Sequence, residues 1–262
     1  MKRTIPTADP HTLEQNLKTL KLKHIRDTLD DLNELALQEE PSYLDFLSYL
    51  VQEEIEGRTE TQRQRRLKAA KFPAWHTLDE FDFAFQNSIS QQNIRDLAKL
   101  DFIEARENLL FLGPPGVGKS HLAVSLGIEA VQSGYHVLFT TLDDLVDQMY
   151  SSLADGSLSR HMNKLLKNQL IILDEVGYLS LDKTASDHLF QLITRAYEKV
   201  SLIITSNLDF SQWGKLFDSP STAAAVLDRL LHHAHVIKLQ GESYRVRNRL
   251  IPQQKLNQGK EG

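Results

Sequence analysis

Hydrophobic residues recur every three to four positions through the first part of the chain. Apolar side chains follow the helical period between Leu13 and Leu35, and the pattern resumes after Pro41, from Tyr43 to Ile55. A stretch rich in Lys and Arg then occupies 58–71. The pattern predicts two amphipathic helices and a small all-helical N-terminal domain over 1–71 that contacts a partner or DNA.

The pattern changes after Pro73. Residues 72–96 predict a linker whose aromatic side chains pack against the next domain. Beyond it, short apolar runs alternate with helical stretches, which predicts an α/β domain over 97–245 with a five-stranded parallel sheet of buried strands. A basic tail is expected over 246–262. The five runs are NLLFLG (108–113), HVLFTT (136–141), QLIILDE (169–175), SLIITSN (201–207) and AHVIKL (234–239).

Composition narrows the possible chemistry. The 262 residues include no cysteine, which excludes disulfides, thiolate catalysis and every cysteine-ligated metal centre. No apolar run reaches membrane-spanning length, and residues 1–15 lack the apolar core of a secretory signal, so we expect a cytoplasmic protein without a membrane partner. The formal net charge is −5, but cations cluster at 58–71 and at Arg245, Arg247 and Arg249. Nucleic-acid binding and a solvated surface both remain open for these clusters.

The motif GPPGVGKS at 113–120 fits the phosphate-binding loop G-x-x-x-x-G-K-[S/T] and lies between a predicted strand and a predicted helix. Backbone N–H groups of such a loop surround phosphate oxygens, Lys119 supplies a charge to the β and γ phosphates, and the Ser120 hydroxyl ligates Mg²⁺. We therefore expect ATP and Mg²⁺ to bind here. The predicted ATP-binding residues are Gly113, Pro114, Pro115, Gly116, Val117, Gly118, Lys119, Ser120 and His121.

Polar residues end the two strands that follow. Asp174 and Glu175 close LIILDE, where one carboxylate can hold Mg²⁺ and the other can polarise water. Asn207 ends the next strand and can reach the γ-phosphate or the attacking water, provided that its strand lies between the other two; a turn residue is the alternative. His232, His233 and His235 follow a predicted helix, and we interpret them as packing or rim residues rather than as a metal site.

The segments FLGPPGVGKSHLA, LIILDEVGYL, LIITSN and GESYR, with RQRRLKAAKFP at the end of the helical module, resemble the IstB family of insertion-sequence ATP-binding helper proteins. These are AAA+ ATPases related to bacterial replicative helicase loaders. The resemblance implies that Asp174 binds Mg²⁺, Glu175 is the catalytic base and Asn207 is the first sensor. Arg229 is similar to an arginine finger that completes the site of a neighbouring subunit, and Arg245 to the family's last sensing arginine.

The same resemblance implies ATP hydrolysis to ADP and phosphate, and an ATP-dependent homo-oligomer on double-stranded target DNA that assists a transposase. Only 23 residues follow Leu239, so the C-terminal lid of other AAA+ proteins is expected to be absent or vestigial. Arg160, Lys164 and Lys167 repeat at near-helical spacing where related proteins contact DNA, with a solvated helix face as the alternative. The run at 58–71 is a second candidate for DNA or the transposase.

Two other functions remain open on the sequence alone. A replicative helicase loader would use the same ATPase core, but would act with single-stranded DNA and a hexameric helicase. An interaction module with a degenerate ATP site would need none of the catalytic residues. The complete set formed by Lys119, Ser120, Asp174, Glu175 and Asn207, together with Arg229, argues against that module.

Overall fold

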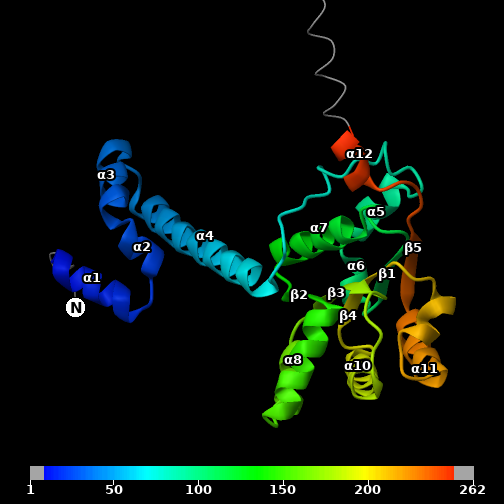
Figure 1. Ribbon diagram of the computed structural model, residues 1–262. Coiled ribbons are helices and arrows are strands. Elements are labelled where there is room, and N and C mark those ends of the chain that lie inside the picture. The colour runs from blue at the N-terminus through cyan, green and yellow to red at the C-terminus, as the bar shows by residue number, and fades with distance from the viewer. Residues whose placement is uncertain (1–8, 251–262) are drawn as a thin grey trace, which may run out of the picture. The chain divides into compact units, whose positions relative to one another are not determined.

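The computed structural model describes residues 9–250, so residues 251–262 of the predicted basic tail lie outside the described part of the chain. The chain divides into two compact units, one ending at Arg65 and the other beginning at Arg66. The first unit is helical and the second contains the sheet (Figure 1). Within the described residues, no helix has both the length and the apolar content to cross a lipid bilayer.

The first unit contains α1 (Pro10–Thr19), α2 (Lys23–Asp27), α3 (Leu29–Glu39) and the beginning of α4 (Tyr43–Ala70). Its all-helical character is confirmed, but the single helix expected between Leu13 and Leu35 is wrong. Lys21 has a φ of 57°, which breaks the first helix, and the Glu54 carboxylate accepts the His24 and Ile25 N–H groups at 2.8 and 3.1 Å. A carboxylate on those donors starts a new helix at α2.

The second unit is built on a five-stranded parallel sheet with strand order β2-β3-β4-β1-β5, so the predicted sheet is confirmed. The prediction of five buried strands is wrong for β5. Among the described residues it pairs only with β1 at the edge of the sheet, and each of its residues is partly or fully exposed. The strands are β1 (Asn108–Leu112), β2 (Val137–Thr141), β3 (Leu170–Val176), β4 (Ser201–Ser206) and β5 (Ala234–Lys238).

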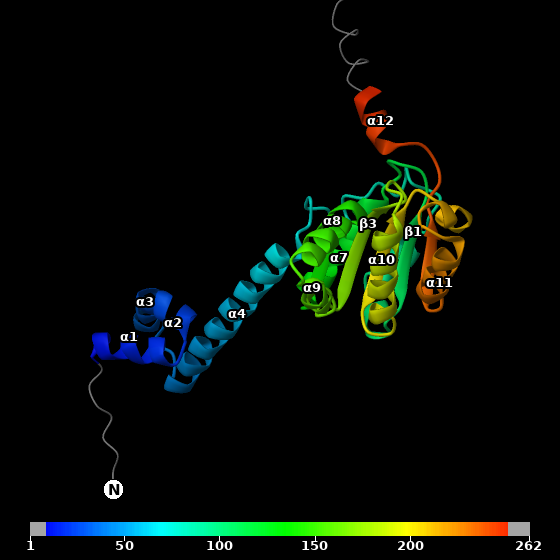
Figure 2. The ribbon, with the colours of Figure 1, turned by 60° about the horizontal axis from the view of Figure 1, so that its bottom comes forward.

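Helices cover both faces of the sheet (Figures 1 and 2). Successive strand residues point to opposite faces, so Leu109 and Phe111 belong to one buried cluster and Leu110 to the other. The first face packs against α5 (Gln91–Leu97), α6 (Asp101–Glu104) and α7 (Lys119–Gln132). The second packs against α8 (Leu142–Ala154), α9 (Leu158–Leu165), α10 (Lys183–Ala196), η1 (Phe210–Lys215) and α11 (Pro220–Leu231).

After β5, one helix, α12 (Tyr244–Leu250), follows within the described residues. It is too short to form a lid of several helices, which agrees with the absent or vestigial lid expected from the sequence. The start of this helix lies against the loop that follows β1, because the Tyr244 N–H donates to Gly116 O at 3.0 Å. The end of the described chain therefore contributes to the edge of the sheet where the strands terminate.

Candidate nucleotide site

The predicted phosphate-binding loop joins β1 to α7 at the carboxyl edge of the sheet. Gly116 and Gly118 have φ values of 82° and 100°, in the left-handed region that favours glycine. A Cβ atom on Gly116 would collide with the Ser243 side chain, and one on Gly118 would lie 2.5 Å from the Phe81 ring. Both glycines are therefore required by conformation and by close packing, and the loop's backbone is held from two sides.

Lys119 opens α7 and is largely buried at the base of this loop. Its Nζ donates to the carbonyl oxygens of Gly113 and Pro114, both at 2.8 Å. Burial lowers the pKa of Lys119, Asp174 opposes that shift, and the cation of Arg245 adds to it. The ammonium group is thus aimed into the loop by two backbone acceptors, in the position where it would meet a phosphate oxygen.

A hydrogen-bonded chain of side chains connects the loop to the ends of β3 and β4. The Ser120 hydroxyl donates to Asp174 Oδ1 at 2.8 Å, and the Thr205 hydroxyl donates to the same oxygen. Thr205 also accepts the N–H of Glu175 at 3.1 Å. Asp174 and Thr205 are 5% and 1% exposed, so their bonds are shielded from water. The network brings together the Ser120 hydroxyl and the Asp174 carboxylate, the two predicted Mg²⁺ ligands, and fixes the backbone of Glu175 beside them.

The sequence analysis did not assign a role to Thr205. Its position became informative only once β4 was placed beside β3, with Leu173 paired to Ile204. The next residue on each strand, Asp174 and Thr205, then lies at the same edge. One signal could have identified Thr205: it is a hydroxyl residue at the end of a strand, and the neighbouring strand ends in an acid.

Glu175 and Asn207 lie at the two strand ends beside this network. Glu175 is exposed and has a φ of 62°, a strained value for a non-glycine residue, where the pairing of β3 with β4 shifts between Leu173 and Val176. Asn207 follows β4, which lies between β3 and β1, as its predicted role requires. Its Oδ1 is buried without a hydrogen-bond partner in the described structure. This acceptor fits a role toward a ligand proton.

A cavity of about 310 Å³ opens next to the loop. One wall is the 76–86 segment, which the sequence predicted only as a packing linker. Gln86, 3% exposed, fixes this wall because its side-chain amide donates to Val117 O at 3.0 Å. The cavity is lined by His76, Glu80, Phe81, Asp82, Phe85, Gln86, Gly116, Val117, Gly118, Lys119, Ser120, His121, Tyr244 and Arg245. Aromatic walls beside a phosphate loop suit a planar base.

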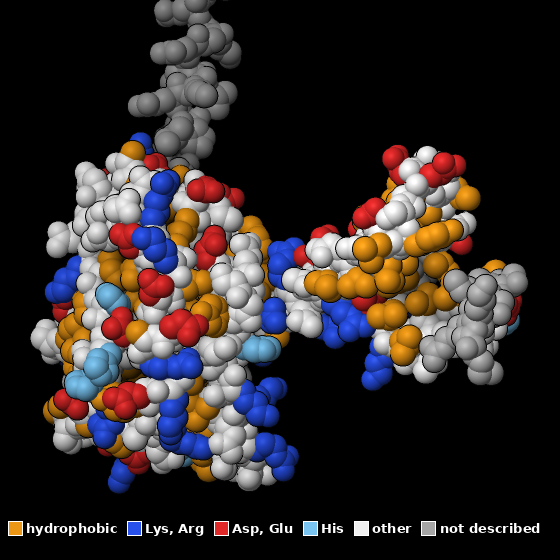
Figure 3. Space-filling model, turned by 180° about the vertical axis from the view of Figure 1, so that it is seen from behind, with side chains coloured by type: hydrophobic (Ala, Val, Ile, Leu, Met, Phe, Trp, Pro, Cys, Tyr) orange, Lys and Arg blue, Asp and Glu red, His pale blue; other side chains and the backbone are white. Residues whose placement is uncertain are grey.

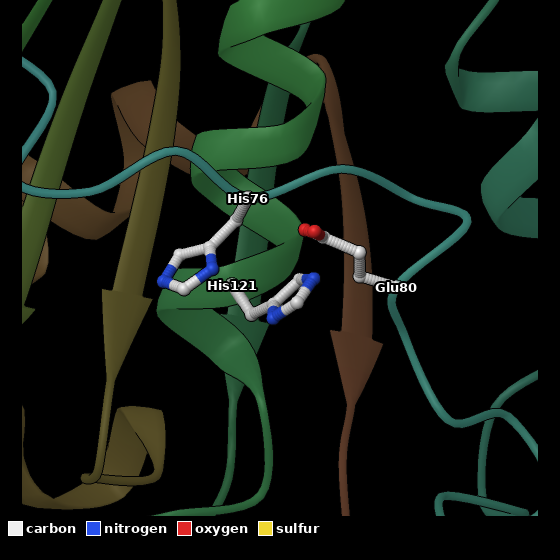
Figure 4. A group of neighbouring side chains, drawn as sticks. All are labelled: His76, Glu80 and His121. Carbon is white, nitrogen blue, oxygen red and sulfur yellow. The ribbon is translucent and has the colours of Figure 1, made fainter.

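The His121 side chain lies between His76 and Glu80 of this wall, as Figure 4 shows. Its Nε2 lies 2.9 Å from Thr77 O, and its ring stacks on His76 with 4.4 Å between ring centroids and 20° between planes. With Glu80, these histidines bring three potential cation ligands within 4.8 Å of one another. Imidazole lone pairs lie in the ring plane, so rings this close to parallel cannot both face one ion until a ring turns. The group therefore serves the cavity as a stacked wall.

The three C-terminal arginines are placed differently. Arg245 lines the cavity and lies close enough to Lys119 to lower the pKa of that lysine. Arg247 instead stacks over the Phe85 ring, with 4.8 Å from its guanidinium carbon to the ring centroid. The side chain of Arg249 is outside the described structure. Of the two that are described, Arg245 lines the cavity and Arg247 does not.

Arg229 lies far from the loop within its own chain. It occupies the last turn of α11, donates to Ala225 O at 2.8 Å and lies over the Phe190 ring at 5.0 Å. Since α11 leads into the first residue of β5, Arg229 is at the edge where the strands begin, opposite to the phosphate loop. The structure therefore does not bring Arg229 to the nucleotide cavity of the same chain.

The histidines near Arg229 each have a protein neighbour. His232 Nδ1 lies 2.6 Å from the Tyr197 hydroxyl, and His235 Nε2 lies 2.7 Å from Glu107. His233 lies 3.8 Å from Glu198. Glu198, His232 and His233 are close enough to hold a cation, but all three are exposed and face solvent. The structure thus places the histidines at the rim of the sheet.

The predicted DNA-contacting residues form one exposed face. Arg160 and Lys164 lie on α9 and Lys167 follows its end, while Met162 and Leu165 on the opposite face are buried in the core. Because α9 precedes the first residue of β3, these cations also lie at the edge where the strands begin. They are therefore separate from the nucleotide cavity.

Comparison with known proteins identifies the family. The model of the IstB-like ATP binding protein family matches residues 15–251. The chain belongs to this family. It is 42% identical over 239 residues to the insertion sequence IS21 putative ATP-binding protein of Pseudomonas aeruginosa, covering 91% of this chain and 90% of the relative. It is 43% identical to the IS5376 putative ATP-binding protein of Geobacillus stearothermophilus, covering 82% and 85%.

Solved structures support the AAA+ fold of this family member. AMPPCP-bound DnaA from Aquifex aeolicus matches with a TM-score of 0.56 and 20% identity, over 71% of this chain and 57% of that one. The crystal structure of DnaI matches with a TM-score of 0.52 and 21% identity, over 64% and 89%. At this identity the likeness concerns the fold alone.

Proposed function

We propose that this IstB-like protein binds and hydrolyses ATP with Mg²⁺, assembles on double-stranded target DNA and assists a transposase. The observation that carries the catalytic part is the buried network from Ser120 through Asp174 and Thr205 to Glu175 beside the phosphate loop. The insertion-sequence names of relatives at 42% and 43% identity support the transposition context. The fold likeness to DnaI, at 21% identity, gives a helicase loader no comparable support.

The residues at the loop fit ATP and Mg²⁺. Ser120 and Asp174 supply a hydroxyl and a carboxylate, which are ligands that Mg²⁺ prefers, and Lys119 supplies a buried cation for phosphate. When bound there, Mg²⁺ would neutralise charge on the phosphate oxygens. Glu175 is exposed beside this point and accepts a proton from the attacking water, while the buried Asn207 Oδ1 orients that water. The aromatic cavity takes the base.

The position of Arg229 supports the proposed assembly. Arg229 lies at the opposite edge of the sheet from its own nucleotide cavity, so it could act on a nucleotide only in a second copy. Arg245, in contrast, already lines the cavity of its own chain. Each complete site would then combine Lys119, Glu175 and Arg245 of one subunit with Arg229 of the next. ATP between subunits would favour assembly, and hydrolysis would reverse it.

Glu175→Gln tests the catalytic and assembly parts together. The variant should retain nucleotide binding and lose about a hundredfold or more in turnover, because the amide cannot accept a proton. Mixing Glu175→Gln with Arg229→Ala should restore part of the turnover, because one subunit supplies the missing arginine and the other the missing carboxylate. Unchanged turnover of Glu175→Gln contradicts the base assignment. A mixture no more active than its components contradicts the arginine finger.

Sedimentation with duplex and single-stranded DNA tests the DNA part. Large assemblies on duplex DNA with ATP, which dissolve with ADP, are the expected result. The Lys119→Ala variant is the control, since it should lose the nucleotide dependence without changing the exposed cations of α9. Preference for single strands, or no assembly until a hexameric helicase is added, would replace the transposition helper by a helicase loader.

A further inference from the structure

The N-terminal unit carries an open hydrophobic groove of about 550 Å³. Its lining comes from α1, from the α2 region, from α3 and from one face of α4, all within residues 13–58. Hydrophobic side chains gather over this unit in Figure 3. The groove is remote in sequence from the nucleotide site and contains none of the residues used in the proposed ATP chemistry.

The α4 wall of this groove is an unpartnered helix face. Leu47, Val51 and Ile55 recur every four residues, line the groove and are 56%, 49% and 52% exposed. Tyr43 extends the same spacing by one turn and is almost fully exposed. Residues four apart lie above one another on a helix, so these side chains form a continuous stripe. A stripe of this length is the usual seat of another amphipathic helix.

The floor of the groove is held by buried side chains and hydrogen bonds, so the groove is ordered before a partner binds. Leu17, Ile25 and Leu32 are buried beneath it. Glu54 ties α4 to the start of α2, because its carboxylate accepts the His24 and Ile25 N–H groups and the Arg58 Nε, the last at 2.6 Å. The bonds to His24 and Ile25 link helices that are about 30 residues apart in sequence, while Arg58 holds the carboxylate from the same helix. A partner would therefore meet a pre-ordered apolar surface.

The charge of the surrounding unit selects the kind of partner. Residues 9–65 contain 13 Asp and Glu against seven Lys and Arg, a formal charge of −6. A second copy of the same unit would bring like charges together, which opposes association. A segment rich in Lys and Arg would instead be attracted to the rim while its apolar face enters the groove.

We propose that this groove binds a basic amphipathic helix of another protein, with leucine-sized side chains at i, i+3 or i+4 and i+7 on its apolar face and Lys and Arg on its polar face. The apolar face packs against the stripe formed by Leu47, Val51 and Ile55. The cations face the acidic surface of the unit. This interaction is independent of ATP hydrolysis, so it can fail while the proposed function holds.

A pair of synthetic helical peptides of about 18 residues tests the proposal, because this length spans about five turns. The two share one leucine stripe and differ only in carrying Lys or Glu on the polar face. Binding to the full chain is measured by fluorescence anisotropy at about physiological ionic strength. The Lys peptide should bind at least about tenfold more tightly than the Glu peptide, and added salt should reduce this ratio.

Matched variants assign the binding to the groove. Leu47→Ser and Ile55→Ser should each weaken the Lys peptide by about tenfold, since each removes an apolar contact. Leu44→Ser is the control, because Leu44 is 76% exposed on the same helix and does not line the groove. All three change exposed side chains, and circular dichroism verifies that they fold. A change of less than about twofold is expected for the control.

Three results would overturn the proposal. The Lys peptide could bind no more tightly than about 100 μM, could bind no better than the Glu peptide, or could be insensitive to Leu47→Ser. Sedimentation of the nucleotide-free chain tests whether a second copy of the chain occupies the groove instead. A dimer that Leu47→Ser dissociates, and Leu44→Ser does not, would assign the groove to a second copy instead.

Discussion

Thr205→Val removes one hydroxyl from the centre of the candidate catalytic network while keeping the shape of the side chain. In the parent, that hydroxyl donates to Asp174 and accepts the Glu175 N–H at 3.1 Å. Valine can do neither. Thr205 does not line the nucleotide cavity but bonds to Asp174 and to the Glu175 backbone, so we expect it to be a positioning residue that acts through the two acids.

The size of the effect follows from these contacts. Thr205 is 1% exposed and Asp174 is 5% exposed, so water cannot readily replace the lost bond. A hydrogen bond to a charged group contributes about 1.5–3 kcal/mol to stability, and we expect Thr205→Val to lose about that much. Glu175 is exposed, so its freed N–H can reach water and adds little. A misplaced base and Mg²⁺ ligand should lower kcat by about 10- to 100-fold.

The assay is steady-state ATP turnover at a series of Mg²⁺ concentrations, with the folded fraction of each variant fixed by thermal melting. Thr205→Ser should restore most of kcat because serine keeps the hydroxyl. Ser206→Ala is the matched control: its hydroxyl is equally buried but bonds only to Leu208, accepting its N–H at 3.1 Å. It should lose stability without a comparable loss of kcat. Equal turnover for Thr205→Val and the parent would refute the reasoning.

Two further predictions concern other parts of the chain. Replacing Lys164 and Lys167 together by Ala should weaken duplex DNA binding and reduce its salt slope by about 1 to 2, because each exposed cation would release about one counterion; an unchanged slope removes α9 from the interface. Hydrogen bonds from Arg58 and from the Ile25 and His24 N–H groups outweigh burial and lower the pKa of Glu54 below 4.5. The stabilisation that Glu54 contributes is therefore complete above the pKa of the unfolded state and is lost as the pH falls through the pKa of the folded state. Glu54→Gln should accelerate hydrogen exchange in residues 9–65 at pH 7, and its exchange rates should approach those of the parent at strongly acidic pH. The exposed control Glu56→Gln should show no such difference.

The strand that carries the candidate catalytic acids was predictable because its residues indicate both a buried strand and a polar strand end. LIILDE is a continuous apolar run, as expected for a strand buried on both faces, and it ends abruptly in Asp174 and Glu175. The phosphate loop was predictable because its sequence motif places glycine where the backbone needs a positive φ. Gly116 and Gly118 have such φ values. Both features depend on residues that are neighbours in sequence, so they could be predicted without knowing the rest of the fold.

The missed features depend on distant parts of the chain. The break between α1 and α2 is held in part by Glu54, about 30 residues away, while apolar periodicity continues through it. Thr205 gains its role from a strand order that no local pattern contains. The 76–86 wall gains its role because Gln86 bonds to Val117 across the loop. Periodicity predicted the amphipathic helix after Pro41 but did not reveal that Leu47, on its apolar face, is more than half exposed.

The net charge of −5 is misleading because the charge is divided unequally between the units. Residues 9–65 account for −6, whereas 66–262 contain 22 acids and 21 Lys and Arg and are nearly neutral. On that neutral background, the exposed cations of α9 are not cancelled by an excess of acid in their own unit. The excess of acid instead belongs to the unit that carries the apolar groove, and this charge would repel DNA and attract a basic helix. Segregation of charge is thus what would allow one acidic chain to present the proposed surface for nucleic acid and, on its other unit, the proposed surface for a protein.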